Sequence, residues 1–131
     1  MAEMEKAFKK VSQLKEGGFI LIEESVCRIK SIEKSKPGRH GAAKARIQAI
    51  GVFDGQKRNL LRPTSAEADI PIIEKGTAQV VAVMGDIVQI MDLKDYSTFD
   101  VKKPGDISGL KSGNEVEFMR YGDNALIVRK K

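Results

Sequence analysis

Apolar and polar residues alternate with a period of two along several short segments of the chain. In the clearest case, Ala45, Ile47 and Ala49 alternate with charged or amide neighbours, which predicts a β-strand with one face on a core. Similar segments, and short apolar runs bounded by turn residues, indicate further strands. We expect strands at 19–22, 26–33, 44–52, 57–61, 78–84, 87–93, 97–101, 115–120 and 125–129. With almost no helical periodicity, the predicted fold is all-β and consists of small barrels.

A change of composition around residues 63–69, followed by Pro71, predicts a boundary between two domains. Residues 1–71 carry a net charge of +5 and residues 72–131 a net charge of 0. The second part holds five predicted strands with one longer insertion between the third and fourth, the strand count of an oligonucleotide-binding (OB) fold. Residues 1–10 are polar, and we expect a frayed arm or a short helical turn there, without an assigned function.

A loop at about residues 35–43 joins two predicted strands of a hairpin, and Pro37, Gly38 and Gly41 favour tight turns in it. From Arg28 to Arg46 the chain has seven basic residues and one acid, whereas the whole chain has a net charge of only +5. The positive charge is therefore concentrated on the hairpin, which favours a phosphate-rich partner. On this basis Lys34, Lys44 and Arg46 are candidate contacts to RNA phosphates.

Composition indicates the state of the cysteine, the compartment of the protein and the nature of its core. The single cysteine, Cys27, cannot form an internal disulfide and lies at an apolar strand position, so we expect a buried thiol. No signal peptide or membrane span is recognisable, and a soluble, cytoplasmic, monomeric protein is expected. The low aromatic content, 5%, implies an aliphatic core, in which Phe99 and Phe118 fit buried positions better than stacking positions.

No motif indicates an enzyme, a cofactor or a metal. His40 is the only histidine, and it has neither a nucleophile motif nor partners for a zinc site. His40 could be a base-stacking or phosphate-contacting side chain or a proton shuttle, and a solvated turn residue is the simplest explanation. An enzyme with His40 as general base is the least favoured alternative. From the residues alone, a general single-stranded RNA-binding or RNA-chaperone protein remains an alternative to a more specialised RNA-binding factor.

Residues 34–46, 50–55, 70–75 and 85–93 closely resemble the archaeal translation initiation factor 5A family, which is related to bacterial elongation factor P. The resemblance implies an SH3-like domain at 1–71 and an OB-fold domain at 72–131. It also implies a non-enzymatic factor that binds the ribosome, with its rRNA and peptidyl-tRNA, and relieves stalling at consecutive prolines. The residues of the tip that would contact peptidyl-tRNA are Lys36, Pro37, Gly38, Arg39, His40 and Gly41.

Arg39 departs from the family pattern, because the family has a lysine there that is converted to hypusine. A guanidinium cannot take part in that reaction, so modification by deoxyhypusine synthase is not expected for this chain. Some elongation factor P proteins have an arginine at the tip, modified by a sugar. Two interpretations of Arg39 therefore stay open: a functional arginine tip, or a substitution that leaves a binding-competent but less active factor.

Overall fold

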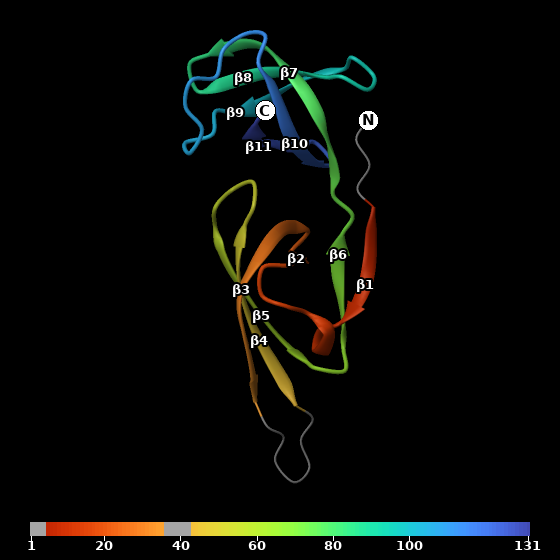
Figure 1. Ribbon diagram of the computed structural model, residues 1–131. Coiled ribbons are helices and arrows are strands. Elements are labelled where there is room, and N and C mark those ends of the chain that lie inside the picture. Colours follow the sequence, from red (N-terminus) through yellow and green to blue (C-terminus); the bar gives the residue numbers. More distant parts are fainter. Residues whose placement is uncertain (1–4, 36–42) are drawn as a thin grey trace. The chain divides into compact units, whose positions relative to one another are not determined.

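The computed structural model describes residues 5–35 and 43–131, and regular structure in these ranges is almost entirely β (Figure 1). The one helical segment in them is a 3₁₀ turn, η1, at Val11–Gln13. The strands are β1 (Lys6–Lys10), β2 (Phe19–Ile22), β3 (Ser25–Ser35), β4 (Lys44–Gly51), β5 (Lys57–Pro63), β6 (Glu67–Pro71), β7 (Glu74–Met84), β8 (Ile87–Asp92), β9 (Thr98–Lys102), β10 (Glu115–Tyr121) and β11 (Asn124–Lys130). The predicted all-β class is confirmed.

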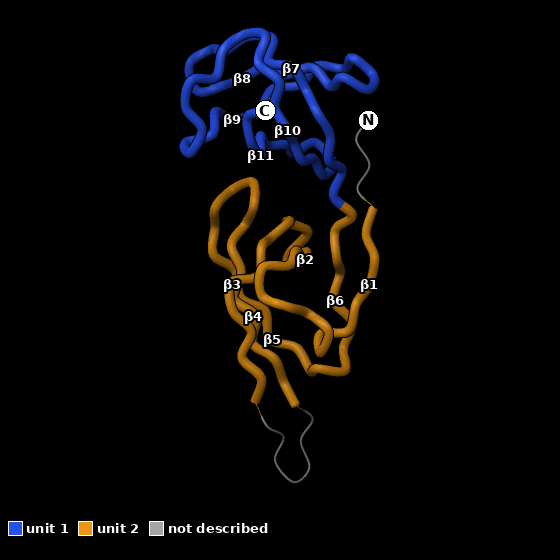
Figure 2. The backbone as a smooth tube through the Cα atoms, in the orientation of Figure 1, with its two compact units in different colours: residues 1–4, 73–131 blue, residues 5–72 orange. Residues whose placement is uncertain are grey.

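Two compact units divide the chain, one formed by residues 5–72 and one that holds residues 73–131 (Figure 2). In the first unit β2, β3, β4 and β5 form an antiparallel sheet in that order, and β1 pairs with β6. Strand β2 also lies against β6, so the two sheets enclose one core. This core is aliphatic and consists of Val11, Leu14, Ile20, Ile22, Cys27, Ile29, Ala45, Ile47, Ala49 and Ala68.

The second unit is a five-stranded antiparallel sheet in the order β11-β10-β7-β8-β9. Its two edge strands, β9 and β11, lie against each other, so the sheet curls into a barrel. Phe118 is the largest fully buried side chain, and it meets Phe99 edge to face with ring centroids 5.3 Å apart. The predicted core position of Phe118 is confirmed, and Phe99 is half-buried against the same core.

The expectation for residues 1–10 is wrong. Residues 6–10 are neither frayed nor helical, since they form β1, which pairs with β6 from Lys6↔Pro71 to Lys10↔Glu67; residues 1–4 lie outside the described part. Every residue of β1 is exposed, so burial leaves no alternating pattern in its sequence. Backbone pairing and an ion pair from Lys6 Nζ to Asp69 Oδ2, 3.5 Å long, hold the strand instead.

Candidate nucleic-acid interface

Strands β3 and β4 form the hairpin that was predicted to carry the basic residues. They stay paired to the ends of the described strands, with Glu33 opposite Arg46 and Ser35 opposite Lys44. Ala45, Ile47 and Ala49 of β4 are buried, as their alternation predicted, so the intervening residues face outward. The predicted tip residues Lys36, Pro37, Gly38, Arg39, His40 and Gly41 lie outside the described residues.

A β-bulge in β3 changes which residues face outward. The register shifts between Ile29, which pairs with Ala49, and Ser31, which pairs with Gln48, so Lys30 is the extra residue. A bulge of this kind re-aims a side chain without breaking the hairpin. Lys30 and Ser31 thus both lie on the outer face, while Ile29 and Ile32 pack on the core. The bulge was not predicted, although the spacing of three between the two isoleucines is its signal in the sequence.

The candidate phosphate contacts come together at the outer end of this hairpin. Lys34, Lys44 and Arg46 line one cleft of about 320 Å³. The other lining residues are Glu33, Ser35 and Leu61. Glu33 is the single acid, so this cleft is electropositive, and open basic clefts suit the phosphates of a nucleic acid backbone.

The three cations are not equivalent. Lys34 is the cross-strand partner of Ala45, which is buried. The Lys34 Nζ donates a hydrogen bond to the Ser12 carbonyl oxygen at 3.4 Å. Lys44 and Arg46 are exposed and form no ion pair with any residue in 5–35 or 43–131. Phosphate contact therefore fits Lys44 and Arg46 best, and Lys34 also braces the hairpin against η1.

The turn between β4 and β5 is held by an ion pair. Arg58 Nη2 lies 2.8 Å from Asp54 Oδ2, and Arg58 Nη1 donates to Asp54 Oδ1 at 3.1 Å. These hydrogen bonds are the main reason why the pKa of Asp54 is lowered to about 2, and the pKa of Arg58 is raised for the same reason. Asp54 Oδ1 also accepts the backbone N–H of Gln56 at 3.0 Å, which shapes the β4–β5 turn.

Two candidate kinds of reactive site, a thiol and a metal-ligand cluster, can be checked in the described residues. The predicted burial of Cys27 is confirmed, and burial raises the pKa of its thiol, which therefore stays protonated and unreactive. Within 5–35 and 43–131, no three His, Cys, Asp or Glu side chains cluster as metal ligands. A search of those same ranges for a helix long and apolar enough to span a membrane found none.

The all-β architecture places this chain among proteins built from small β-barrels, with a basic hairpin on the first unit. The family described as "Translation initiation factor 5A-like, N-terminal" matches residues 6–66. The chain is 49% identical over 130 residues to translation initiation factor 5A of Methanopyrus kandleri, covering 95% of this chain and 96% of that protein. It is 47% identical over 132 residues to the same factor of Pyrobaculum arsenaticum, covering 98% and 100%.

A solved structure agrees with these matches. The structure titled "Eukaryotic translation initiation factor 5A from Methanococcus jannaschii" superposes with a TM-score of 0.90 at 41% identity, covering 96% of this chain and 95% of that one. The chain belongs to the archaeal translation initiation factor 5A family. The predicted pair of barrels, SH3-like and then OB-fold, is thereby confirmed, and family membership supports a role as a translation factor.

Proposed function

We propose that this protein is a non-enzymatic, cytoplasmic translation factor that binds the ribosome next to peptidyl-tRNA as a monomer. There it promotes peptide-bond formation at stalling sequences such as polyproline. The single observation that carries the proposal is the basic cleft at the outer end of the β3–β4 hairpin, where Lys44 and Arg46 are exposed and unpaired among the described residues.

The proposal divides the work between two domains. The first, at 1–71, is the SH3-like domain that presents the tip loop at about 35–43, and the second, at 72–131, is the OB-fold domain. Lys34, Lys44 and Arg46 contact phosphates of rRNA or tRNA, which fixes position without reading sequence. The tip, with Arg39 and His40, then reaches the peptidyl end.

In this mechanism the factor supplies no acid, base or nucleophile. It restricts the flexible end of peptidyl-tRNA to a reactive geometry, which lowers a barrier by limiting unproductive motion. Arg39 is permanently charged and suits a backbone phosphate. Because it is shorter than a hypusine side chain and cannot be a substrate of deoxyhypusine synthase, stimulation of proline–proline synthesis is weaker than a modified lysine gives.

Ribosome co-sedimentation combined with a reconstituted polyproline translation assay tests the proposal. The double variant Lys44→Gln, Arg46→Gln loses two exposed ionic contacts at about 1 kcal/mol each, so ribosome affinity falls roughly 30-fold. The matched control is Lys9→Gln, Lys10→Gln, which removes the same charge from the exposed strand β1. Arg39→Ala lowers the rate at proline pairs and leaves binding largely intact.

Two results contradict the proposal. If the hairpin variant and the β1 control weaken binding equally, the effect is one of net charge and not of a site. If the wild-type protein binds arbitrary RNA in a salt-sensitive manner and never sediments with ribosomes, the protein is a general single-stranded RNA-binding or chaperone protein.

A further inference from the structure

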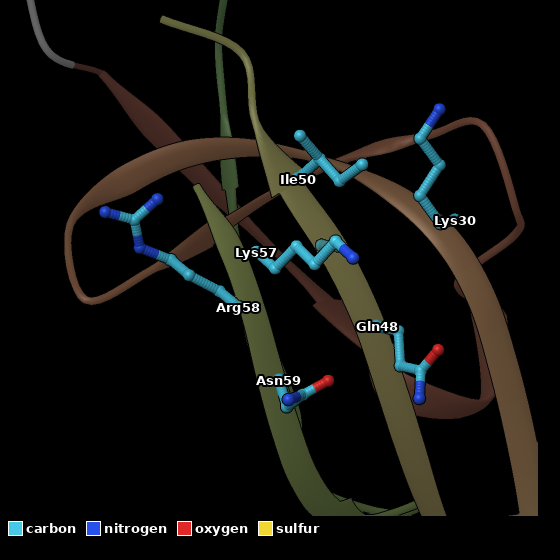
Figure 3. A pocket seen from close by; sticks show the side chains of 7 residues that line it. Lys30, Gln48, Ile50, Lys57, Arg58 and Asn59 are labelled. Atoms are coloured by element: carbon cyan, nitrogen blue, oxygen red, sulfur yellow. The ribbon is translucent and has the colours of Figure 1, made fainter. Parts of the chain in front are cut away.

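A second cleft lies on the outer face of the four-stranded sheet, between the bulge of β3 and the start of β5 (Figure 3). Its volume is about 310 Å³, at the lower end of the range of small-ligand sites, roughly 300–1,000 Å³. Lys30, Gln48, Ile50, Lys57 and Asn59 line it. These residues come from three strands, so the cleft exists only once the sheet has formed.

Two amide side chains lie in adjacent strands of this cleft. Gln48 sits opposite Ser31 on one side and opposite Asn59 on the other. Ser31 Oγ donates a hydrogen bond to Gln48 Oε1 at 3.1 Å, which orients the amide and leaves its NH₂ group for a ligand. The Asn59 amide has no side-chain hydrogen bond to any residue in the described ranges, so its donor and acceptor are both available.

Only some of the nearby cations are free to bind an anion. Arg28 donates to the Gly17 carbonyl oxygen at 3.4 Å and stacks over the Phe19 ring at 4.7 Å. Arg58 is paired with Asp54, and Figure 3 shows its side chain pointing away from Lys57.

The two lysines of the cleft differ from Arg28 and Arg58 in having no such partner among the described residues. Lys30, which lies on the outer face at the bulge, and Lys57 are exposed. Neither forms an ion pair with a carboxylate of the described chain. The cleft thus combines two uncommitted positive charges with two adjacent amides and the apolar side chain of Ile50.

We propose that this cleft binds one nucleotide of a single RNA strand, with the base on the amides and on Ile50 and the phosphate between Lys30 and Lys57. A side-chain amide with a free donor and acceptor pairs in bidentate fashion with adenine, and Asn59 offers both groups. Adenine is therefore the preferred base. The proposal relies on the proposed function in one respect only, that the ligand is RNA.

The geometry of β4 supports RNA over a small free nucleotide. Lys44, Arg46, Gln48 and Ile50 share its outward face, so both clefts open on the same side of one strand. The distance along β4 from Lys44 to Ile50 is about 20 Å at roughly 3.3 Å per residue. A single RNA strand along β4 contacts the hairpin cleft through its backbone and leaves one base in the second cleft.

Nuclear magnetic resonance on the ¹⁵N-labelled full chain tests the site directly. Titration with adenosine monophosphate shifts the side-chain NH₂ resonances of Gln48 and Asn59, and uridine monophosphate binds about fivefold more weakly. Inorganic phosphate and a tetraglutamate peptide are the comparison ligands. Equal affinity for the two nucleotides overturns the base contact, and equal shifts with tetraglutamate overturn RNA as the ligand.

Two variants separate the phosphate contact from the base contact, with binding of a labelled oligoadenylate measured by fluorescence anisotropy. Lys30→Gln, Lys57→Gln lowers the slope of log affinity against log salt by about 0.7, since the two lysines share one phosphate and each single-strand phosphate contact contributes roughly 0.7. Asn59→Ala leaves that slope unchanged and removes the preference for adenine over uridine. The control is again Lys9→Gln, Lys10→Gln; a slope change as large in the control overturns the proposal.

The outcome also distinguishes this site from the proposed function. If Lys30→Gln, Lys57→Gln binds oligoadenylate, ribosomes and all nucleotides as the wild type does, the second cleft is not a binding site, and the proposed function stands. If the variants change RNA binding as expected while the wild type does not sediment with ribosomes, the nucleotide site stands and the ribosomal function fails.

Discussion

Substitution of Gly76 by alanine probes the core of the second unit. A Cβ at Gly76 would lie 2.9 Å from Cε1 and Cζ of Phe118, whereas ordinary contact begins at 3.4 Å, so the ring must move by about 0.5 Å. The Phe118 ring cannot move freely, because it meets Phe99 edge to face and has the Arg120 guanidinium 5.6 Å from its centroid. Overpacking of this kind costs about 1–3 kcal/mol of unfolding free energy.

The unfolding of this unit can be followed by itself. The chain has no tryptophan and two tyrosines, Tyr96 and Tyr121, and both lie in residues 73–131. Tyrosine fluorescence during urea and thermal denaturation therefore reports the second unit alone. For a unit of this size 1 kcal/mol corresponds to roughly 4–8 °C, so a loss of about 2 kcal/mol lowers Tm by roughly 8–16 °C.

Two further variants isolate the steric cause. Gly105→Ala is the matched control, because a Cβ there meets no atom within 4 Å and the backbone is not in the left-handed region; its stability is unchanged or slightly raised. In a Phe118→Leu background the smaller leucine side chain leaves room for the alanine Cβ, so Gly76→Ala lowers the unfolding free energy by less than about 0.5 kcal/mol. If Gly76→Ala does not destabilise the wild-type protein, or if it destabilises the Phe118→Leu variant as much as the wild type, the steric argument is wrong.

Two other predictions concern charges in the first unit. Asp54→Asn keeps the acceptor for the Gln56 N–H and removes the ion pair to Arg58. Because the pKa of Asp54 is lowered to about 2, the variant is less stable than wild type above pH ~4. The difference in unfolding free energy between the two proteins, the stability gap, closes as the pH falls towards 2. Thermal unfolding by far-ultraviolet circular dichroism measures this, and a gap that persists at pH ~2 argues against the ion pair. Glu33→Gln removes the single acid of the hairpin cleft and tightens RNA binding about twofold at low salt. The control Glu67→Gln makes the same charge change on β6 and does not tighten binding. Equal effects of the two variants would mean that net charge alone decides affinity.

The elements with one buried face were predictable from sequence. The strands corresponding to β2, β4, β8 and β10 were found to within a residue or two. In β4 alternating burial gives alternating residue types, whereas β2 is a short apolar run bounded by turn residues. Strand β1 was missed because all five of its residues are exposed. Strand β6 was not predicted as a paired strand, since residues 63–69 were interpreted as a change of composition and residues 70–73 only as an extended crossing segment.

Contacts between distant residues were not predictable in the same way. Arg120 binds Glu74 across β10 and β7, with Nη2 2.9 Å from Oε1, and lies 3.7 Å from the buried Asp92. It also stacks over the Phe99 ring at 4.7 Å. Nothing near Arg120 in the chain indicates these partners, because strand pairing alone brings them together. The hydrogen bonds to Glu74 are the main cause that raises the pKa of Arg120.

That the basic residues gather on one hairpin follows from the amino-acid sequence, since alternation sets the strands and Pro and Gly set the turn between them. The tertiary structure decided which of these charges are available to a ligand. Pairing with neighbouring strands and turns engages Arg28 with Phe19 and Gly17, and Arg58 with Asp54. It leaves Lys30, Lys44, Arg46 and Lys57 on one outer face without ion-pair partners in the described chain. A charge count depends only on composition, whereas a free charge depends on what the fold places within a few ångströms of it.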